Sequence, residues 1–293
     1  MPQKQTFFFR FGLNSLISYL LGIALTTAFY LAVTIFTANA FRIPVEVSFN
    51  GISFPISDYS PLWTGDAIRL IFIAGPAACL IWAFIFLGWF LMLPARQIFL
   101  RDLGFWMVFH GFNLAFGGII AGVLTSSGFA WFAKWIYLNE TARFFIALIS
   151  VFLLGVIGLA LARPALQGAP ALWFIRDTQR WRFVLARLLF PWLGSVFLLS
   201  LLRLPVLPLH DLILLFTPGI MLAAIIAGIQ SHRDFELEAQ FLDSLEEDEQ
   251  DMDLRERLYA PPRKYAVYWG CLLIILLGSV FYRIIFSTGI IFG

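Results

Sequence analysis

The sequence is poor in charge, because only 13% of its 293 residues are Asp, Glu, Lys or Arg, against about a quarter in soluble globular proteins. Hydrophobic residues make up 60% of the chain, and the mean hydropathy is +0.85. A chain with so little charge is typical of an integral membrane protein, with the lipid bilayer as its first partner. The net charge of +2 provides no basic surface for nucleic acid, and we predict no nucleic-acid partner.

Cysteine and histidine are scarce, with two and three residues. Cys79 and Cys271 lie within apolar runs, which favours small core residues over a disulfide or a metal site. Covalent haem attachment needs C-x-x-C-H, which is absent. A bis-histidine haem needs two imidazoles at one membrane depth, which His110 and His210 do not share; His110 and His232 meet only if their helices lean together. We therefore predict no haem, other cofactor or metal.

Catalytic motifs are missing as well. The sequence contains no H-E-x-x-H, no G-x-S-x-G and no Walker loop. Ser126, Ser127 and His110 are present, but nothing in their spacing ties them together as nucleophile and base. We predict no catalytic residues, although this leaves open whether the protein is an enzyme.

What the sequence has is long apolar runs. Seven are long enough to cross a hydrocarbon core of about 30 Å, which takes about 20 helical residues. They lie at about 13–37, 67–93, 103–125, 142–163, 187–204, 209–230 and 265–286. The pattern predicts an all-α polytopic bundle of about seven spans, in which the fifth and sixth runs can form one close hairpin.

Short loops indicate the orientation. If the runs alternate, the basic residues of the N-terminal segment and of the loops after the second, fourth and sixth runs fall on one side. By the positive-inside rule that side is the cytoplasm. We expect a multi-pass protein of the inner (plasma) membrane with a cytoplasmic N-terminus and an extracytoplasmic C-terminus.

Two outer segments have recognisable patterns. Residues 41–66 contain an alternating stretch, Val45 to Asn50, followed by a turn at Gly51, which predicts a small β-hairpin on the membrane surface. The next outer loop, 129–141, mixes tryptophans with Lys134, the composition of a helix lying in the interface.

The loop 231–264 separates a transmembrane bundle at 1–230 from a C-terminal helix and tail at 265–293. Eleven of the eighteen acidic residues lie between Asp234 and Glu256. An acidic segment is repelled by the negative inner leaflet, so we expect it to project into the cytoplasm. It could dock a basic partner, such as another membrane subunit, or serve as a solvated linker.

Charged residues of the spans lie near span ends. Arg69, Asp102, Arg203, Asp211 and Arg283 are placed where side chains can snorkel to the interface, which argues against ion-coupled transport. The segment 170–187 is rich in arginine and aromatic residues. It is interpreted either as an ordinary juxtamembrane helix whose arginines meet headgroups or as a site for anionic lipid or a partner.

The third run carries the unusual polar residues. At 100° per residue, His110, Asn113 and Gly117 share one helical face. A second face holds Gly111, Ala115, Gly118 and Gly122, whose small side chains allow close helix packing. The first face is either a polar cavity that contacts a ligand or an interhelical hydrogen-bonded contact.

Part of the chain resembles the site-2 protease family of intramembrane zinc peptidases. The resemblance covers residues 13–125. It rests on a first span, an outer strand-like segment, Gly75 and Pro76 at the opening of the second span, and Phe112-Asn113-Leu114 in the third. It implies helix packing at Gly75 and Pro76, but the ligands of the family are missing. Cys79 stands where the family has asparagine, and the first span has neither histidine nor glutamate. The resemblance therefore implies a relative without zinc.

Three functions remain open. The first is a non-enzymatic subunit, scaffold or partner-binding component of a membrane complex. The second is a facilitative transporter or channel-like protein with a cavity at His110 and Asn113. The third is a degenerate protein of the site-2 protease type.

Overall fold

The computed structural model describes residues 2–48, 51–94, 97–169, 177–204, 207–231, 266–287 and 289–292. Within these ranges six helical segments are long and apolar enough to cross a membrane. They are α1 (Pro2–Ala40), α2 (Gly65–Met92), α3 (Ile98–Phe112) continued by η1 (Asn113–Gly117) and α4 (Gly118–Thr125), α6 (Glu140–Gln167), α7 (Asp177–Val184) continued by η3 (Leu185–Leu189) and α8 (Phe190–Leu202), and α9 (Leu209–Phe216) continued by α10 (Pro218–Ser231). The predicted helical bundle is therefore confirmed for these segments.

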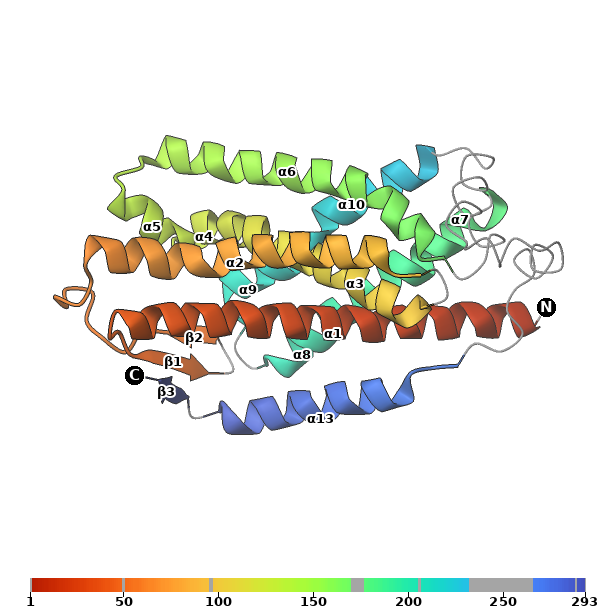
Figure 1. Cartoon of the computed structure of the whole chain (residues 1–293), viewed down its shortest axis with the longest axis horizontal. Coiled ribbons are helices and arrows are strands. Elements are labelled where there is room, and N and C mark those ends of the chain that lie inside the picture. The colour runs from red at the N-terminus through yellow and green to blue at the C-terminus, as the bar shows by residue number, and fades with distance from the viewer. Residues whose placement is uncertain are drawn as a thin grey trace.

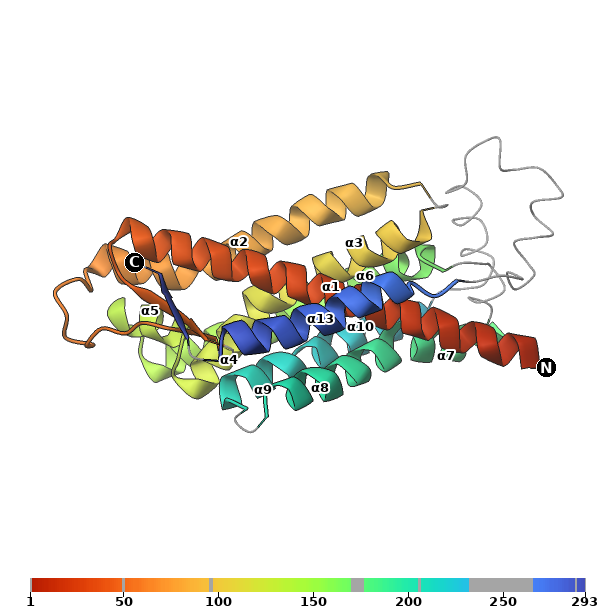
Figure 2. The ribbon, with the colours of Figure 1, turned by 90° about the horizontal axis from the view of Figure 1, so that it is seen from below.

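A shorter helix, α13 (Trp269–Ile285), has 17 residues and lies alongside α1 (Figures 1 and 2). Asn14 of α1 ties down the start of this segment. Its side chain donates to the Ala266 carbonyl at 2.8 Å and accepts from the Tyr268 backbone N–H at 3.1 Å. The start of α1 and strand β3 lie at opposite ends of the bundle (Figure 1).

The predicted hairpin forms. Strands β1 (Val45–Ser48) and β2 (Gly51–Ser53) pair antiparallel, with Val47 opposite Ile52. A third strand, β3 (Ile290–Phe292), which the sequence pattern did not indicate, pairs antiparallel with the other edge of β1. The sheet order is therefore β2-β1-β3, and the C-terminal segment is joined to the hairpin that follows α1.

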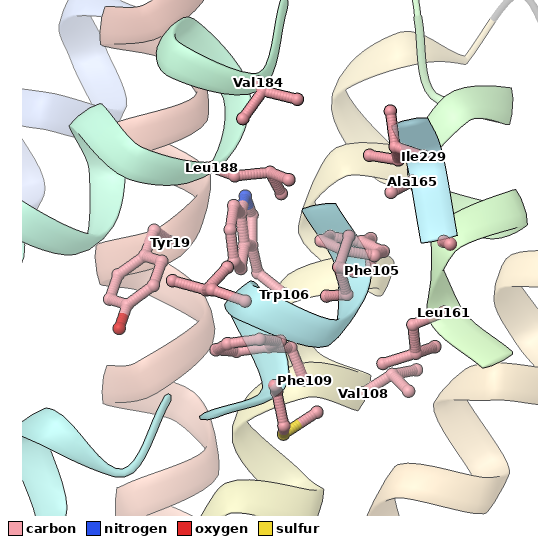
Figure 3. Close-up of a cluster of buried hydrophobic side chains, with 14 of the residues drawn as sticks. Tyr19, Phe105, Trp106, Val108, Phe109, Leu161, Ala165, Val184, Leu188 and Ile229 are labelled. Carbon is pink, nitrogen blue, oxygen red and sulfur yellow. The ribbon is translucent and has the colours of Figure 1, made fainter. Parts of the chain in front are cut away.

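The segment α3–η1–α4 is the interior helix of the bundle. Of its most apolar window 72% is buried, whereas the other five long segments range from 22% to 44%. Figure 3 shows the core around Phe105, Trp106 and Phe109 of α3, between Tyr19 of α1 on one side and Leu161 of α6 on the other. The outer helices present their remaining apolar side chains outward, as expected for helices that face lipid.

One helical boundary differs from the sequence expectation. The fifth segment begins earlier than the predicted residue 187, because Gln179–Leu202 is continuous helix and its basic residues lie inside it. The predicted interface segment contains a short helix, α5 (Phe129–Trp135), in which Lys134 Nζ lies 5.9 Å from the centre of the Trp131 ring.

Candidate functional site

The third segment contains a π-helical turn, η1, at the position of its polar residues. Such turns occur mostly as single bulges in α-helices and are frequent at functional sites. His110 precedes the turn, and Asn113 and Gly117 are its first and last residues. All three are buried, with His110 1% exposed and Asn113 3% exposed.

His110 packs against α1. Its ring meets the ring of Tyr19 edge-on, with centroids 4.4 Å apart, and it faces Gly22, where an added Cβ would lie 3.3 Å from His110 Cδ2. The ring is within reach of the Tyr19 backbone carbonyl, while Nε2 has no hydrogen-bond partner among the described residues. The imidazole is thus enclosed by aromatic neighbours.

Asn113 faces a different part of the bundle. Its amide nitrogen donates to the Leu214 carbonyl at 3.3 Å, and its amide oxygen accepts from Thr217 Oγ1 at 2.8 Å. Gly117 lies beside this contact, because an added Cβ there would lie 2.6 Å from Thr217 Oγ1. The predicted polar face is therefore divided: His110 joins α3 to α1, and Asn113 joins η1 to the α9–α10 segment.

The predicted packing glycines behave differently from one another. Gly111 approaches α2 closely, since an added Cβ would lie 2.8 Å from Ala83 Cβ. Gly122 packs against the local turn that follows α4, with Ser127 O at 2.8 Å from such a Cβ. Gly118 has nothing within 4 Å of an added Cβ, so this glycine makes no close helix contact among the described residues.

Gly75 and Pro76 lie inside α2. Gly75 lies under the Tyr30 ring of α1, since an added Cβ would lie 2.7 Å from Tyr30 Cζ. This close approach is the kind of helix packing that small residues permit. Pro76 is accommodated within the helix without ending it.

Two glycines make close contacts between α6 and α10, and the sequence pattern did not indicate them. Gly158 of α6 lies against Met221 O of α10, at 2.5 Å from an added Cβ, and Gly228 of α10 lies against Ala162 Cβ at 2.6 Å. Glycine spacing alone does not identify these partners, because each glycine meets a helix that is distant in the sequence.

The expectation that Asp102 snorkels to the membrane interface is wrong. Asp102 is 5% exposed and Arg187 is 0% exposed, and Asp102 Oδ1 lies 3.0 Å from Arg187 Nη1. Two ionised groups removed from water are stable only when paired. Arg187 also donates to the Gly168 carbonyl at 2.9 Å. An ordinary juxtamembrane arginine would contact lipid headgroups. Arg187 instead contacts Asp102 and Gly168 inside the protein.

Gly168 makes room for this guanidinium. An added Cβ would lie 2.6 Å from Arg187 Cζ, so a larger side chain at this position would displace the guanidinium. The guanidinium also lies 5.2 Å from the centre of the Phe105 ring and 5.9 Å from that of Phe183. These aromatic faces contribute a further favourable interaction with the buried charge.

A second polar cluster lies where α4 meets α9, and sequence spacing did not reveal it. Ser127 Oγ lies 3.0 Å from His210 Nδ1, and Thr125 Oγ1 lies 3.2 Å from the same nitrogen. Serine and histidine thus come together, with His210 rather than His110 as the partner. A pair at this distance matches the spacing of nucleophile and base.

The direction of these hydrogen bonds depends on the tautomer of His210. The one hydroxyl hydrogen of Thr125 is donated to the Ala121 carbonyl at 2.7 Å. Ser127 Oγ lies 2.7 Å from Thr125 Oγ1, so Ser127 donates either to Thr125 or to His210 Nδ1. The tautomer of His210 decides between the two, because Nδ1 accepts only when it carries no hydrogen.

An ion pair next to this cluster joins the end of the fifth long segment to the start of the sixth. Arg203 contacts the Asp211 carboxylate, and Trp192 Nε1 donates to the Leu215 carbonyl at 3.1 Å. The predicted hairpin of these segments is thereby held at its turn. Burial lowers the pKa of Arg203, which lies outside the long helices. Arg203 and Asp211 are therefore also paired within the protein.

The segments that carry the site-2 protease resemblance pack against one another. Cys79, Leu114 and Ala115 form one buried cluster with Tyr30 beside it. In the part of the chain that the structure describes, no group of three histidine, cysteine or acidic side chains could hold a metal ion. A phenol and a thiol among apolar side chains provide no zinc site here.

Comparisons with family models, with curated proteins and with solved structures found no match to this chain. The acidic loop 231–264, with His232, lies outside the described residues apart from Ser231 at the end of α10.

Proposed function

We propose that the protein is a non-enzymatic subunit or partner-binding component of a complex in the inner membrane. The observation that carries this proposal is that α13 is anchored at both ends but exposed along its length. The helix is tied to α1 at its start and to the β-sheet just beyond its end, yet none of its side chains is buried. A helix fixed at both ends but uncovered along its length is suited to contact with another membrane protein.

One face of α13 has the composition of a helix contact. Gly270, Ile274 and Gly278 follow at intervals of four residues, so they lie on the same face. Ile274 is 67% exposed, and added Cβ atoms at Gly270 and Gly278 would meet nothing within 4 Å. Small residues allow close approach in lipid, where packing rather than the hydrophobic effect joins helices. We name these three residues the α13 face.

The proposed orientation follows the basic loops, with the N-terminus in the cytoplasm. Since β3 and the hairpin lie at the opposite end of the bundle from the start of α1, this orientation implies that they are outside. In this arrangement α13 crosses as a seventh, short span. Its 17 residues rise about 26 Å at 1.5 Å per residue, slightly less than a typical core. Pairing with another helix is one way in which a short span reduces the cost of hydrophobic mismatch with the bilayer.

Photo-crosslinking tests this proposal directly. A photoreactive amino acid placed at Ile274 should give an adduct of protein size in native membranes. The matched control is Ile149 of α6, which is 56% exposed and apolar but lies on a different helix. Ile149 should crosslink to lipid only. Adducts of lipid alone from both positions would contradict the proposal.

A glycine pair gives a second test. Gly278→Leu fills the α13 face, whereas Gly155→Leu adds the same side chain on α6, where an added Cβ also meets nothing within 4 Å. After gentle solubilisation, the partner should copurify with Gly155→Leu and be lost from Gly278→Leu. Equal recovery with both variants, or no stoichiometric partner with the unsubstituted chain, would count against the proposal.

The transporter hypothesis has less support. It needs a water-accessible pocket that both His110 and Asn113 line. The two side chains face different neighbours, and both are almost fully buried. The kinship with site-2 proteases stays a prediction. A relative that has lost the zinc ligands would be compatible with a partner-binding role.

A further inference from the structure

The Asp102–Arg187 pair belongs to a larger buried polar cluster, which we name the arginine cluster. It is formed by side chains from α1, from the start of α3 and from η3: Ser15, Ser18, Arg101, Asp102 and Arg187. Each of these residues is at most 6% exposed. Ser15 Oγ donates to the Arg187 backbone carbonyl at 3.0 Å, and both serine side chains lie within reach of the Asp102 carboxylate.

Several donors in the cluster have no acceptor. In the described chain, Arg101 Nε and the Nε and Nη2 atoms of Arg187 are buried without a hydrogen-bond partner. Ser18 Oγ and Asp102 Oδ1 are also unpaired by strict geometry, but these two groups lie within reach of each other. More than about 90% of buried polar groups in proteins are paired, and each unpaired one costs about 1–3 kcal/mol. Three such N–H donors in one cluster therefore require a common explanation.

The arginine cluster also carries an excess of positive charge. Two guanidinium groups share one carboxylate, which leaves a net charge of +1. Arg187 pairs with Asp102, whereas Arg101 lies 5.4 Å from the centre of the Phe90 ring. Arg101 is also near enough to Arg187 for their charges to repel. A buried cluster with excess positive charge and surplus N–H groups is complementary to an anion.

We propose that the arginine cluster binds one small monovalent anion of the chloride type. The anion accepts hydrogen bonds from Nε and Nη2 of Arg187, and Arg101 supplies the second positive charge. The small size follows from burial, because side chains that are at most 6% exposed leave no opening for a lipid headgroup. The single charge follows from Asp102, whose carboxylate repels a multivalent anion more strongly than a monovalent one.

Binding of radiolabelled chloride to the detergent-purified full chain tests the proposal. One saturable site is expected in the unsubstituted protein. Arg101→Gln removes the excess charge and should weaken binding about tenfold or more, as loss of a charged contact does. Arg101→Lys keeps the charge and should retain most of the affinity. Arg182→Gln is the control: it removes one positive charge at an exposed arginine and should bind like the unsubstituted chain.

Thermal unfolding provides the second readout, because a ligand that binds only the folded state raises the unfolding midpoint. Replacing gluconate by chloride at constant ionic strength should raise the midpoint of the unsubstituted chain and of Arg182→Gln, and should leave that of Arg101→Gln unchanged. Absence of saturable chloride binding would overturn the proposal and indicate that water meets the donors. Stabilisation by phosphatidylglycerol in nanodiscs, with none by chloride, would overturn it in favour of a lipid headgroup.

Discussion

Asp102 of α3 and Arg187 of η3 form an ion pair at 3.0 Å in the interior of the bundle. Removing one partner leaves the other charge buried and unpaired, which costs about 3–5 kcal/mol. Asp102→Asn should therefore lower the free energy of unfolding by that amount. The double variant Asp102→Asn, Arg187→Gln should recover much of it, because no charge is stranded. Chemical denaturation in detergent, analysed as a double-mutant cycle, measures the coupling. Losses that simply add would show that the two residues do not act as a pair.

Two glycines of α6 should respond differently to the same substitution. Gly158→Leu places a side chain against Met221 and Ala224 of α10, where an added Cβ already lies 2.8 Å from Ala224 Cβ. Overpacking of this kind costs about 1–3 kcal/mol or more, so the unfolding midpoint should fall. Gly155→Leu should have little effect, because its position is open. A similar fall for both variants would argue that leucine disturbs α6 itself and not its contact with α10.

Much of the fold could be predicted from the sequence. Runs of apolar residues identified the six long helices, and the alternation from Val45 onward identified the β1–β2 hairpin. These features depend on local pattern. Strand β3 could not be predicted, because three residues carry too little pattern and the pairing of Ile291 with Glu46 joins opposite ends of the chain.

The arginine cluster illustrates what single-sequence reasoning misses. Arg187 lies next to a span end in the sequence, so contact with lipid headgroups was the simpler interpretation. The available signal was that Arg187 and Asp102 each have apolar neighbours and carry opposite charges near the same expected side of the membrane. That signal indicates a pair only when α3 and η3 are adjacent, and their adjacency depends on packing. In the same way, the periodicity placed His110 and Asn113 on one face but did not reveal that they meet different helices.

The contact between Thr217 and Asn113 should contribute measurably to stability. Thr217→Val keeps the shape of the side chain but leaves Asn113 Oδ1 without its donor, 2.8 Å away in the unsubstituted chain. A buried acceptor left unpaired costs about 1–3 kcal/mol. Thr34→Val is the matched control, since that hydroxyl donates only to the Tyr30 carbonyl of its own helix at 2.9 Å. The unfolding midpoint should fall clearly for Thr217→Val and little for Thr34→Val. The reverse order would show that the Asn113 contact carries no stability.

The attachment of α13 should depend on Asn14. Its amide makes two hydrogen bonds to the backbone at residues 266 and 268, and it is the polar link between α1 and the start of α13. Asn14→Leu removes both bonds while keeping a similar volume. Local opening governs amide exchange, so hydrogen exchange at the first turns of α13 should become faster while exchange in α3 stays unchanged. Ser279→Ala is the control, because that hydroxyl bonds only to the Ile275 carbonyl within α13. If Asn14→Leu left exchange in α13 unaffected, the sheet at the other end of the helix would be sufficient to hold it against α1.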